Sequence, residues 1–206
     1  MDCCFDRTGF PCIKLKVPAL AVNLLPLTKL QFEYYLADLT PQGDHWYEEL
    51  LTLNPRVSPQ CFTPEQREGL FLTGLLPAEA EAYAAWLEDG YRLPTVAEWR
   101  ASYRCFQSTA FTPLVASPAP GVRAAALLRR LEEQARPQTL FDFSLMRGGV
   151  VEWVRDHNAW TGLGAPRPGF QPNLWNPLSD TVPPVRLNQH VAFFGARLVC
   201  ERGKIL

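Results

Sequence analysis

The chain has 206 residues, of which 47% are hydrophobic and 12% aromatic, so it is long enough to bury a sizeable core and we expect one domain. Twenty Lys and Arg against 21 Asp and Glu leave a formal net charge of -1, and no cluster of four basic residues occurs. This composition excludes the strongly basic class of nucleic-acid-binding proteins and gives no sign of a surface for anionic membranes.

The first ten residues, MDCCFDRTGF, contain an early acid and no long apolar run. This pattern is typical of neither a secretory signal nor a membrane span, so we expect a cytoplasmic protein without a membrane partner. The cysteines have no CxxC spacing, and in a reducing compartment we expect free thiols rather than disulfides or a zinc site. They are Cys3, Cys4, Cys12, Cys61, Cys105 and Cys200.

Extended and helical patterns alternate in the first third of the chain. Apolar and basic residues alternate over 12–17, which predicts a strand, and 18–27 is a second extended segment interrupted by prolines. Residues 28–39 place most of their large apolar side chains on one helical face, with Thr28 as the N-cap.

Shorter elements are predicted next. Residues 43–53 are a candidate short helix and 69–74 a candidate short strand. Residues 77–90 have Pro in the first turn, early acids and Gly90 at the position of a C-terminal cap, which predicts a helix.

The segment RLPTVAEWR, residues 92–100, predicts a turn followed by a helix. Pro94 favours an extended residue before it, and Thr95 with Glu98 forms a T-x-x-E capping box. The helix would then direct Trp99 into the core, so these residues indicate a structural role.

The second half contains one strongly amphipathic helix and two strands. Residues 122–136 predict the helix, which could pack on the core or on a partner, and 148–156 and 193–201 predict the strands. Residues 156–192 show almost no periodicity, which in a compact domain is typical of a functional or disordered segment.

Three of these segments resemble, in order, conserved segments of the formylglycine-generating enzyme (sulfatase-modifying factor) family. RLPTVAEWR at 92–100 resembles the family's R-L-P-T-E-A-E-W-E, RGGVVEWVRD at 147–156 its G-N-x-W-E-W, and FFGARLVCE at 193–201 its closing G-F-R-L-V strand. The helical segments 25–38 and 76–94 are similar to two further segments of that family. The resemblance implies an α+β, C-type-lectin-like fold that is irregular and loop-rich, with short mixed sheets and a few helices.

The resemblance also implies a single domain over residues 1–206, with a helical insertion at about 107–139. Family enzymes use two copper-binding cysteines between W-E-W and G-F-R-L-V, because soft thiolates suit Cu(I). Between Trp153 and Gly195 this chain has no cysteine, and the family's R-G-G-S-W segment is missing. We therefore expect a divergent member, a pseudoenzyme without the catalytic cysteines.

Two metal sites can be drawn from the remaining residues. Asp156, His157 and His190 have the residue types of an iron site in a metal-dependent oxygenase, but their spacing does not support it. Calcium in family members uses the Asn and Glu of G-N-x-W-E-W; here Glu152 remains, while Gly149 replaces the Asn. We expect no cofactor, with Glu152 as the weak calcium candidate.

A non-catalytic protein-binding or accessory module, a subunit of a larger bacterial assembly, is the first functional hypothesis. Lectin-like relatives bind ligands between W-E-W and the final strand, and aromatic, Arg and Asn side chains in that stretch are typical of an interface centre. The predicted contact residues are His157, Asn158, Trp160, Arg167, Phe170, Asn173, Trp175, Asn176, Arg186, Asn188 and His190.

Two other hypotheses remain open at this point. One is an oxygenase or oxidase of the same family with a rebuilt active site. The other is a structural subunit held to its partner by the 122–136 helix through Leu127 and Leu131.

Overall fold

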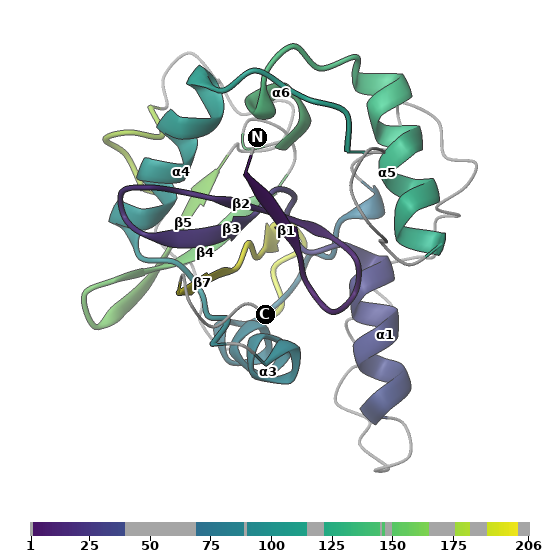
Figure 1. Ribbon diagram of the computed structural model, residues 1–206. Helices are drawn as coiled ribbons and strands as arrows, with labels where there is room; N and C mark the ends of the chain where they lie inside the picture. Colours follow the sequence, from purple (N-terminus) through teal and green to yellow (C-terminus); the bar gives the residue numbers. More distant parts are fainter. Residues whose placement is uncertain are drawn as a thin grey trace.

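The computed structural model describes residues 2–39, 69–88, 90–114, 122–144, 146, 150–164, 176–181 and 189–201. They form an α+β fold of short strands and helices (Figure 1). The elements, in chain order, are β1 (Cys3–Phe5), β2 (Pro11–Lys14), β3 (Leu20–Asn23), α1 (Lys29–Leu39), α3 (Pro77–Leu87), α4 (Val96–Ser108), α5 (Val122–Ala135), α6 (Leu140–Ser144), β4 (Val151–Asp156), β5 (Ala159–Gly164), β6 (Phe194–Gly195) and β7 (Val199–Glu201).

The first sheet joins the two ends of the described chain. Its strand order is β1-β2-β3-β7, and every neighbouring pair is antiparallel. Cys12 lies opposite Cys4 on one side and Asn23 on the other, and Ala21 lies opposite Cys200. The C-terminal strand therefore completes a sheet that the N-terminal hairpin begins.

The second sheet has three strands in the order β5-β4-β6. β4 and β5 form a long antiparallel hairpin, whereas β4 and β6 are parallel. Because β6 and β7 belong to different sheets, the single strand predicted over 193–201 is wrong in detail. The segment crosses between the sheets, and its central residue Arg197 is buried between them.

Apolar clusters cover both faces of the first sheet. On one face, strand residues such as Ile13, Val22 and Val199 pack with side chains from α4, α5 and α6. On the other face, Cys12 and Cys200 pack in the cluster that includes side chains of α1 and α3. Alternate residues of each strand thus enter different cores, which explains why β2 and β3 are almost wholly buried.

Two helices begin with the cap expected from the sequence. Thr28 Oγ1 accepts from the Gln31 amide at 3.2 Å, and the Gln31 side chain accepts from the Thr28 amide at 3.0 Å. Thr95 and Glu98 exchange the same two bonds at 3.2 and 2.8 Å. Such a cap is worth about 1 kcal/mol of stability.

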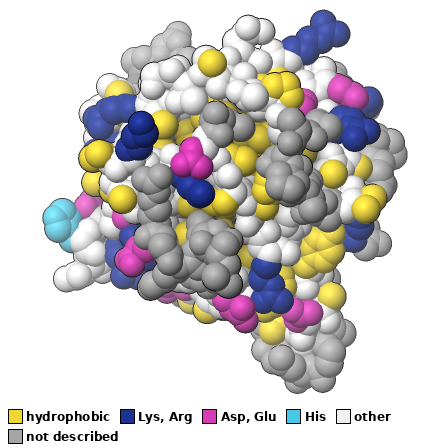
Figure 2. Space-filling view, viewed as in Figure 1, with side chains coloured by type: hydrophobic (Ala, Val, Ile, Leu, Met, Phe, Trp, Pro, Cys, Tyr) yellow, Lys and Arg dark blue, Asp and Glu magenta, His cyan; other side chains and the backbone are white. Residues whose placement is uncertain are grey.

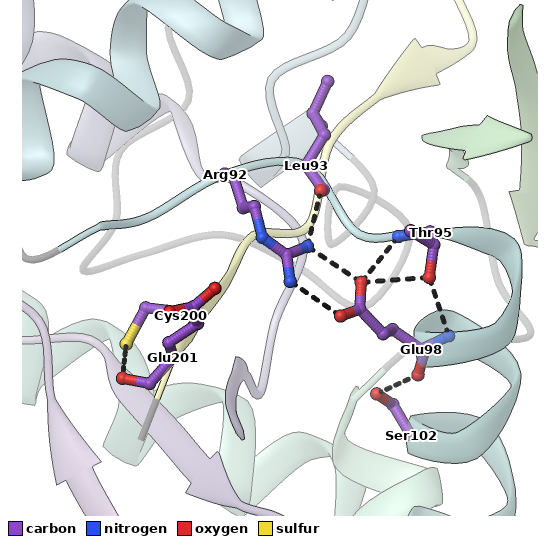
Figure 3. A network of polar contacts seen from close by, with 7 residues as sticks. All are labelled: Arg92, Leu93, Thr95, Glu98, Ser102, Cys200 and Glu201. Carbon is purple, nitrogen blue, oxygen red and sulfur yellow. Dashed lines mark hydrogen bonds and ion pairs between the residues drawn. The ribbon is translucent and has the colours of Figure 1, made fainter. Parts of the chain in front are cut away.

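Glu98 also fixes the turn before its helix. The Arg92 guanidinium donates to both of its oxygens, at 2.7 and 2.8 Å, so Arg92 and Thr95 converge on one carboxylate (Figure 3). Burial alone would raise the pKa of Glu98, but these hydrogen bonds outweigh it and hold the pKa below its usual value. The prediction that RLPTVAEWR has a structural role is confirmed.

Other predicted elements differ from the structure in three places. The strand expected at 69–74 is a short turn of helix followed by one β-bridge, from Phe71 to Thr28. The helix expected to extend to Gly90 ends at Leu87, and Glu88 takes the positive φ of 65° after it. The aperiodic segment 156–192 contains β5, while the helix predicted at 43–53 lies outside the described residues.

The amphipathic helix α5 packs on the core. Its apolar face buries Ala124, Leu127, Leu128 and Leu131 in the cluster shared with α4 and α6. The hypothesis that Leu127 and Leu131 hold a partner is therefore wrong, because these side chains are 1% and 2% exposed within the chain itself.

None of the helices described here is long and apolar enough to cross a membrane. The cysteines of the described ranges are thiols, as predicted, and Cys61 lies outside those ranges. Cys200 is fully buried and packs as a small apolar side chain.

Candidate functional site

Residues of three separate segments, 92–100, 150–156 and 193–201, meet at one buried carboxylate. Glu152 accepts a hydrogen bond from Trp99 Nε1 at 2.6 Å and two from the Arg197 guanidinium, each at 2.9 Å. Arg197 also donates to the main-chain carbonyls of Asn23, Leu24 and Ser144. Trp99, Glu152 and Arg197, one residue from each segment, therefore form a hydrogen-bonded cluster in the core.

This arrangement bears on the calcium candidate. Both Glu152 oxygens accept hydrogen bonds within the core, and the Glu152 and Arg197 side chains are 0% exposed. A cation at Glu152 would have to compete with a guanidinium that already neutralises the carboxylate. These neighbours do not fit a calcium site, and Glu152 stays the weak calcium candidate that the sequence suggested.

An exposed face of small residues runs along α3, between two stacked side-chain pairs. Ala78, Ala82 and Ala85 are exposed, and at 100° per residue they lie on one face of the helix. Glu81 lies to one side of this face and Trp86 to the other. Figure 1 shows α3 on the outside of the molecule, beneath the sheets.

The first stacked pair lies on the β4–β5 hairpin. Arg155 and Trp160 are cross-strand partners, and the guanidinium lies 4.8 Å from the centre of the indole ring. Arg155 Nη2 also donates to Glu81 Oε1 on α3 at 2.7 Å, and the Arg155 amide donates to Pro94 O at 2.9 Å. Trp160 is half-buried against the core, so the hairpin holds an aromatic anchor with a fixed cation over it.

The second stacked pair lies on the other side of α3. The Arg7 guanidinium lies 4.4 Å from the centre of the Trp86 ring and donates to Trp86 O at 2.7 Å. Trp86 Nε1 donates to Asp38 at the end of α1 at 2.8 Å. Weaker ion pairs join Arg7 to Asp38 and Glu88, so both terminal nitrogens of Arg7 lie near a carboxylate of a neighbouring segment.

We name the surface made by the alanine face of α3 and these two pairs the α3 surface: Ala78, Ala82, Ala85, Glu81, Arg155, Trp160, Arg7 and Trp86. Its arginines are close to carboxylates, so it has no strong charge of one sign. In Figure 2, Lys and Arg side chains likewise lie next to Asp and Glu at several places on the face shown.

The tip of the β4–β5 hairpin carries two of the predicted contact residues. The last strand pair is Asp156 with Ala159, which leaves His157 and Asn158 as a two-residue turn, with His157 at a positive φ of 55°. His157 Nδ1 lies 2.8 Å from Asp156 Oδ1, and the imidazole is 95% exposed. These side chains project next to the first stacked pair.

Asn176 lies apart from the hairpin, in a turn that packs on α4. Its side-chain Oδ1 accepts from the Leu178 main-chain amide at 3.0 Å, and its main-chain amide donates to Asp180 Oδ2 at 2.8 Å. Arg100 of α4 donates to the carbonyls of Pro177 and Asp180. The Asn176 side chain therefore shapes a turn in the described structure.

His190 is largely buried at the start of α3. Its Nε2 lies 2.9 Å from Glu79 Oε1, and the two side chains are only 9% and 13% exposed. Glu79 Oε2 accepts from the Leu76 amide, the backbone donor that precedes the helix. His190 thus ties the end of the aperiodic segment to α3.

Six predicted contact residues lie outside the described residues: Arg167, Phe170, Asn173, Trp175, Arg186 and Asn188. No sequence pattern pointed to four further residues of the α3 surface, Arg155, Glu81, Arg7 and Trp86. The D-H-N-A stretch between Arg155 and Trp160 has no glycine turn signal, so the hairpin that pairs these two residues was not evident. The other contacts join residues far apart in the chain.

Across the described ranges, no three or more His, Cys, Asp or Glu side chains come close enough to share a metal ion. Asp156 and His157 at the hairpin tip and His190 beside Glu79 therefore do not assemble the iron site that their types suggested.

Comparisons with known proteins show a related fold. No protein-family profile matches the chain, and no curated protein matches it in sequence. A solved structure described as "Crystal Structure of CarF" superposes with a TM-score of 0.50 at 16% identity, over 97% of this chain and 96% of that one. At this identity the similarity shows fold alone.

Proposed function

We propose that this protein is a non-catalytic binding module that docks another protein across the α3 surface, as a subunit of a larger bacterial assembly. The observation that carries the proposal is the exposed alanine face of α3 between the Arg155–Trp160 and Arg7–Trp86 pairs. The predicted contacts His157 and Asn158 extend this surface at the hairpin tip.

The scaffold that we infer is that of the formylglycine-generating enzyme family, with a C-type-lectin-like fold. Its support is the convergence of the three family-like segments on the Trp99, Glu152 and Arg197 contacts. A family-like core without the family's cysteine pair is consistent with a scaffold kept for binding rather than for oxidation.

The physical chemistry of the α3 surface suits a protein partner. Alanine side chains let a partner backbone approach the helix closely, while Trp and Arg are the side chains that most often dominate interface energies. Arg155 and Arg7 are already held by stacking and by carboxylates, so binding would cost less side-chain entropy than ordering mobile arginines. The paired charges favour a partner recognised by shape rather than one recognised by net charge.

A bulky substitution at the centre of the surface tests the proposal. Ala82→Arg adds a long side chain at an exposed position of α3, and arginine is a good helix former, so the fold should persist. Gln107→Arg makes the same addition at an exposed position of α4 and serves as the matched control. Tagged full-length proteins would be isolated from the source cell, and captured partners quantified by native mass spectrometry.

We expect a stoichiometric protein partner with the wild type and with Gln107→Arg, and at least about tenfold less of it with Ala82→Arg, which corresponds to about 1.4 kcal/mol. A photo-crosslinking residue placed at position 82 should attach to that partner, and one at position 107 should not. Equal capture by both variants would place the interface elsewhere. Stoichiometric iron or copper in the purified protein without any partner would favour the oxygenase or oxidase alternative.

A further inference from the structure

Cys4 and Cys12 lie directly opposite each other on antiparallel strands β1 and β2. The Asp6 amide donates to Phe10 O and the Lys14 amide to Asp2 O, two residues away on either side. Because ladder hydrogen bonds alternate along an antiparallel pair, the cysteines occupy a hydrogen-bonded position, where the Cα atoms are about 5.5 Å apart. Disulfides span Cα separations of about 4.4 to 6.8 Å, so the backbone already has a suitable spacing.

The two thiols have different surroundings. Cys4 is half-buried on β1, which among the described strands pairs with β2 alone, and its Sγ lies 3.7 Å from Cys12 O. Cys12 is fully buried, with its Sγ 3.3 Å from the Tyr91 hydroxyl and 3.4 Å from Asn23 Nδ2. Cys4 is therefore the thiol that a small oxidant can meet, whereas the Cys12 side chain is closed off from solvent.

The charges near the pair support the same division. A hydrogen bond from Cys12, and next the Lys14 ammonium, lower the pKa of Cys4, although burial opposes them. The hydrogen bond to Cys4, followed by burial, raises the pKa of Cys12. Since the thiolate is the reactive form, Cys4 is the nucleophile of the pair and Cys12 is the resolving thiol.

We propose that Cys4 and Cys12 are a redox-active pair that closes to a reversible intrachain disulfide when Cys4 meets a hydroperoxide. The Cys4 thiolate attacks one peroxide oxygen and the O–O bond breaks. Hydroxide departs, or alkoxide in the case of an alkyl hydroperoxide, and Cys4 becomes a sulfenic acid. The Cys12 sulfur then attacks the Cys4 sulfur, the S–O bond breaks, and the hydroxyl leaves with the Cys12 proton as water. Sulfur is oxidised by two electrons in total and the peroxide is reduced by two.

The register of the sheet makes the site selective. Cys3 lies opposite Ile13 and packs against the other core cluster, so its direct cross-strand neighbour is an isoleucine. Cys200 lies opposite Ala21 on β7 and is fully buried. Between β1 and β2, the Cys4 and Cys12 positions therefore place two thiols directly opposite each other.

Peptide mapping of peroxide-treated protein tests the proposal. The full-length protein would be treated with a slight excess of hydrogen peroxide, remaining thiols alkylated, and the chain cleaved after Arg7 and Lys14. These cleavages separate Cys4 from Cys12 on peptides 1–7 and 8–14. We expect the two peptides to be linked, with two hydrogens lost, and the link to disappear after dithiothreitol.

Two variants make the result specific. Cys3→Ser should form the same link, since the serine is not part of the pair, and Cys4→Ser should leave Cys12 alkylated as a thiol. A link from Cys3 to Cys12, assigned by fragmentation between residues 3 and 4, would overturn the proposal. Oxidation of Cys4 to sulfinic acid with Cys12 still alkylated would overturn it as well, because Cys12 would then have failed to resolve the sulfenic acid.

Discussion

The Glu152 carboxylate and the Arg197 guanidinium form a two-point ion pair in the centre of the protein, with both side chains wholly removed from water. Glu152 comes from β4 of one sheet, and Arg197 from the crossing between β6 and β7. Trp99 of α4 donates to the same carboxylate. One buried charge pair thus joins both sheets and a helix.

Removal of Arg197 should destabilise the protein strongly. In Arg197→Met, the Glu152 carboxylate stays buried with only Trp99 as a donor, so the free energy of unfolding should fall by about 3 to 5 kcal/mol. Guanidinium denaturation followed by tryptophan fluorescence measures the change. The double variant Glu152→Gln with Arg197→Met should recover part of the loss, and a single variant within about 1 kcal/mol of wild type would contradict the central role of the pair.

Leu127 of α5 should matter for folding rather than for assembly. Leu127→Ala removes a side chain that is 1% exposed in the core cluster, so it should cost about 2 to 5 kcal/mol of stability. Arg130→Ala, at an exposed position of the same helix, should change stability by less than about 0.5 kcal/mol. Thermal denaturation separates the two. Unchanged stability in Leu127→Ala with loss of a partner would restore the hypothesis that α5 is an interface helix.

Asp6 should make stability fall as pH rises over part of the acid range. Burial raises its pKa above the usual 3.8, against hydrogen bonds from Thr8 and Phe10. Between the unfolded and the folded pKa, the folded state binds more proton than the unfolded state, so its stability decreases with pH through that window. Above the folded pKa the penalty for the buried charge is complete.

Asp6→Asn isolates this effect from the other carboxylates, some of which have lowered pKa values and act in the opposite direction. The uncharged amide does not titrate, so the stability of wild type relative to Asp6→Asn should be greatest below the usual pKa of 3.8 and should decrease as the pH rises through the raised pKa of the folded state. Urea denaturation of both proteins across that range measures it. A difference that is independent of pH would show that Asp6 titrates alike in both states.

Gly195 should not tolerate even a methyl group. A Cβ there would lie 2.7 Å from Leu72 O and 2.5 Å from Val150 Cγ1, and the Leu72 backbone is held by its hydrogen bond to Leu27. Gly195→Ala should therefore cost about 1 to 3 kcal/mol, measured by thermal denaturation. Ala192→Ser, at an exposed position nearby, should stay within about 0.5 kcal/mol. Equal melting temperatures for Gly195→Ala and the wild type would mean that β6 can shift to admit the methyl group without loss of stability.

Elements whose signals are local agree best between sequence and structure. The two residues of each capping pair, Thr28 with Gln31 and Thr95 with Glu98, are three positions apart in the chain. The helix α5 has a regular apolar face. β5 and the split of 193–201 into β6 and β7 had no such signal, because pairing with β4 decides β5 and β6, and pairing with β3 decides β7.

The candidate site shows the same division. His157 and Trp160 were predicted from their residue type and from their place between the W-E-W-like segment and the final strand. The structure adds the partners that make a surface of them: Arg155 across the hairpin and Glu81 from α3. Asn176 and His190 were predicted with them, yet the structure places one in a turn against α4 and the other beside Glu79. Composition cannot distinguish an exposed Asn or His from one that supports the backbone.

By itself, the sequence determined the helix starts at Thr28 and Thr95, the inward direction of Trp99 and the amphipathic character of α5, because each depends on residues within one or two turns. Only the tertiary structure decided that Glu152 pairs with Arg197, that Cys4 faces Cys12, and that two Arg–Trp pairs flank α3. These contacts depend on strand register and on which distant segments meet, and burial of the whole chain selects them rather than local propensity.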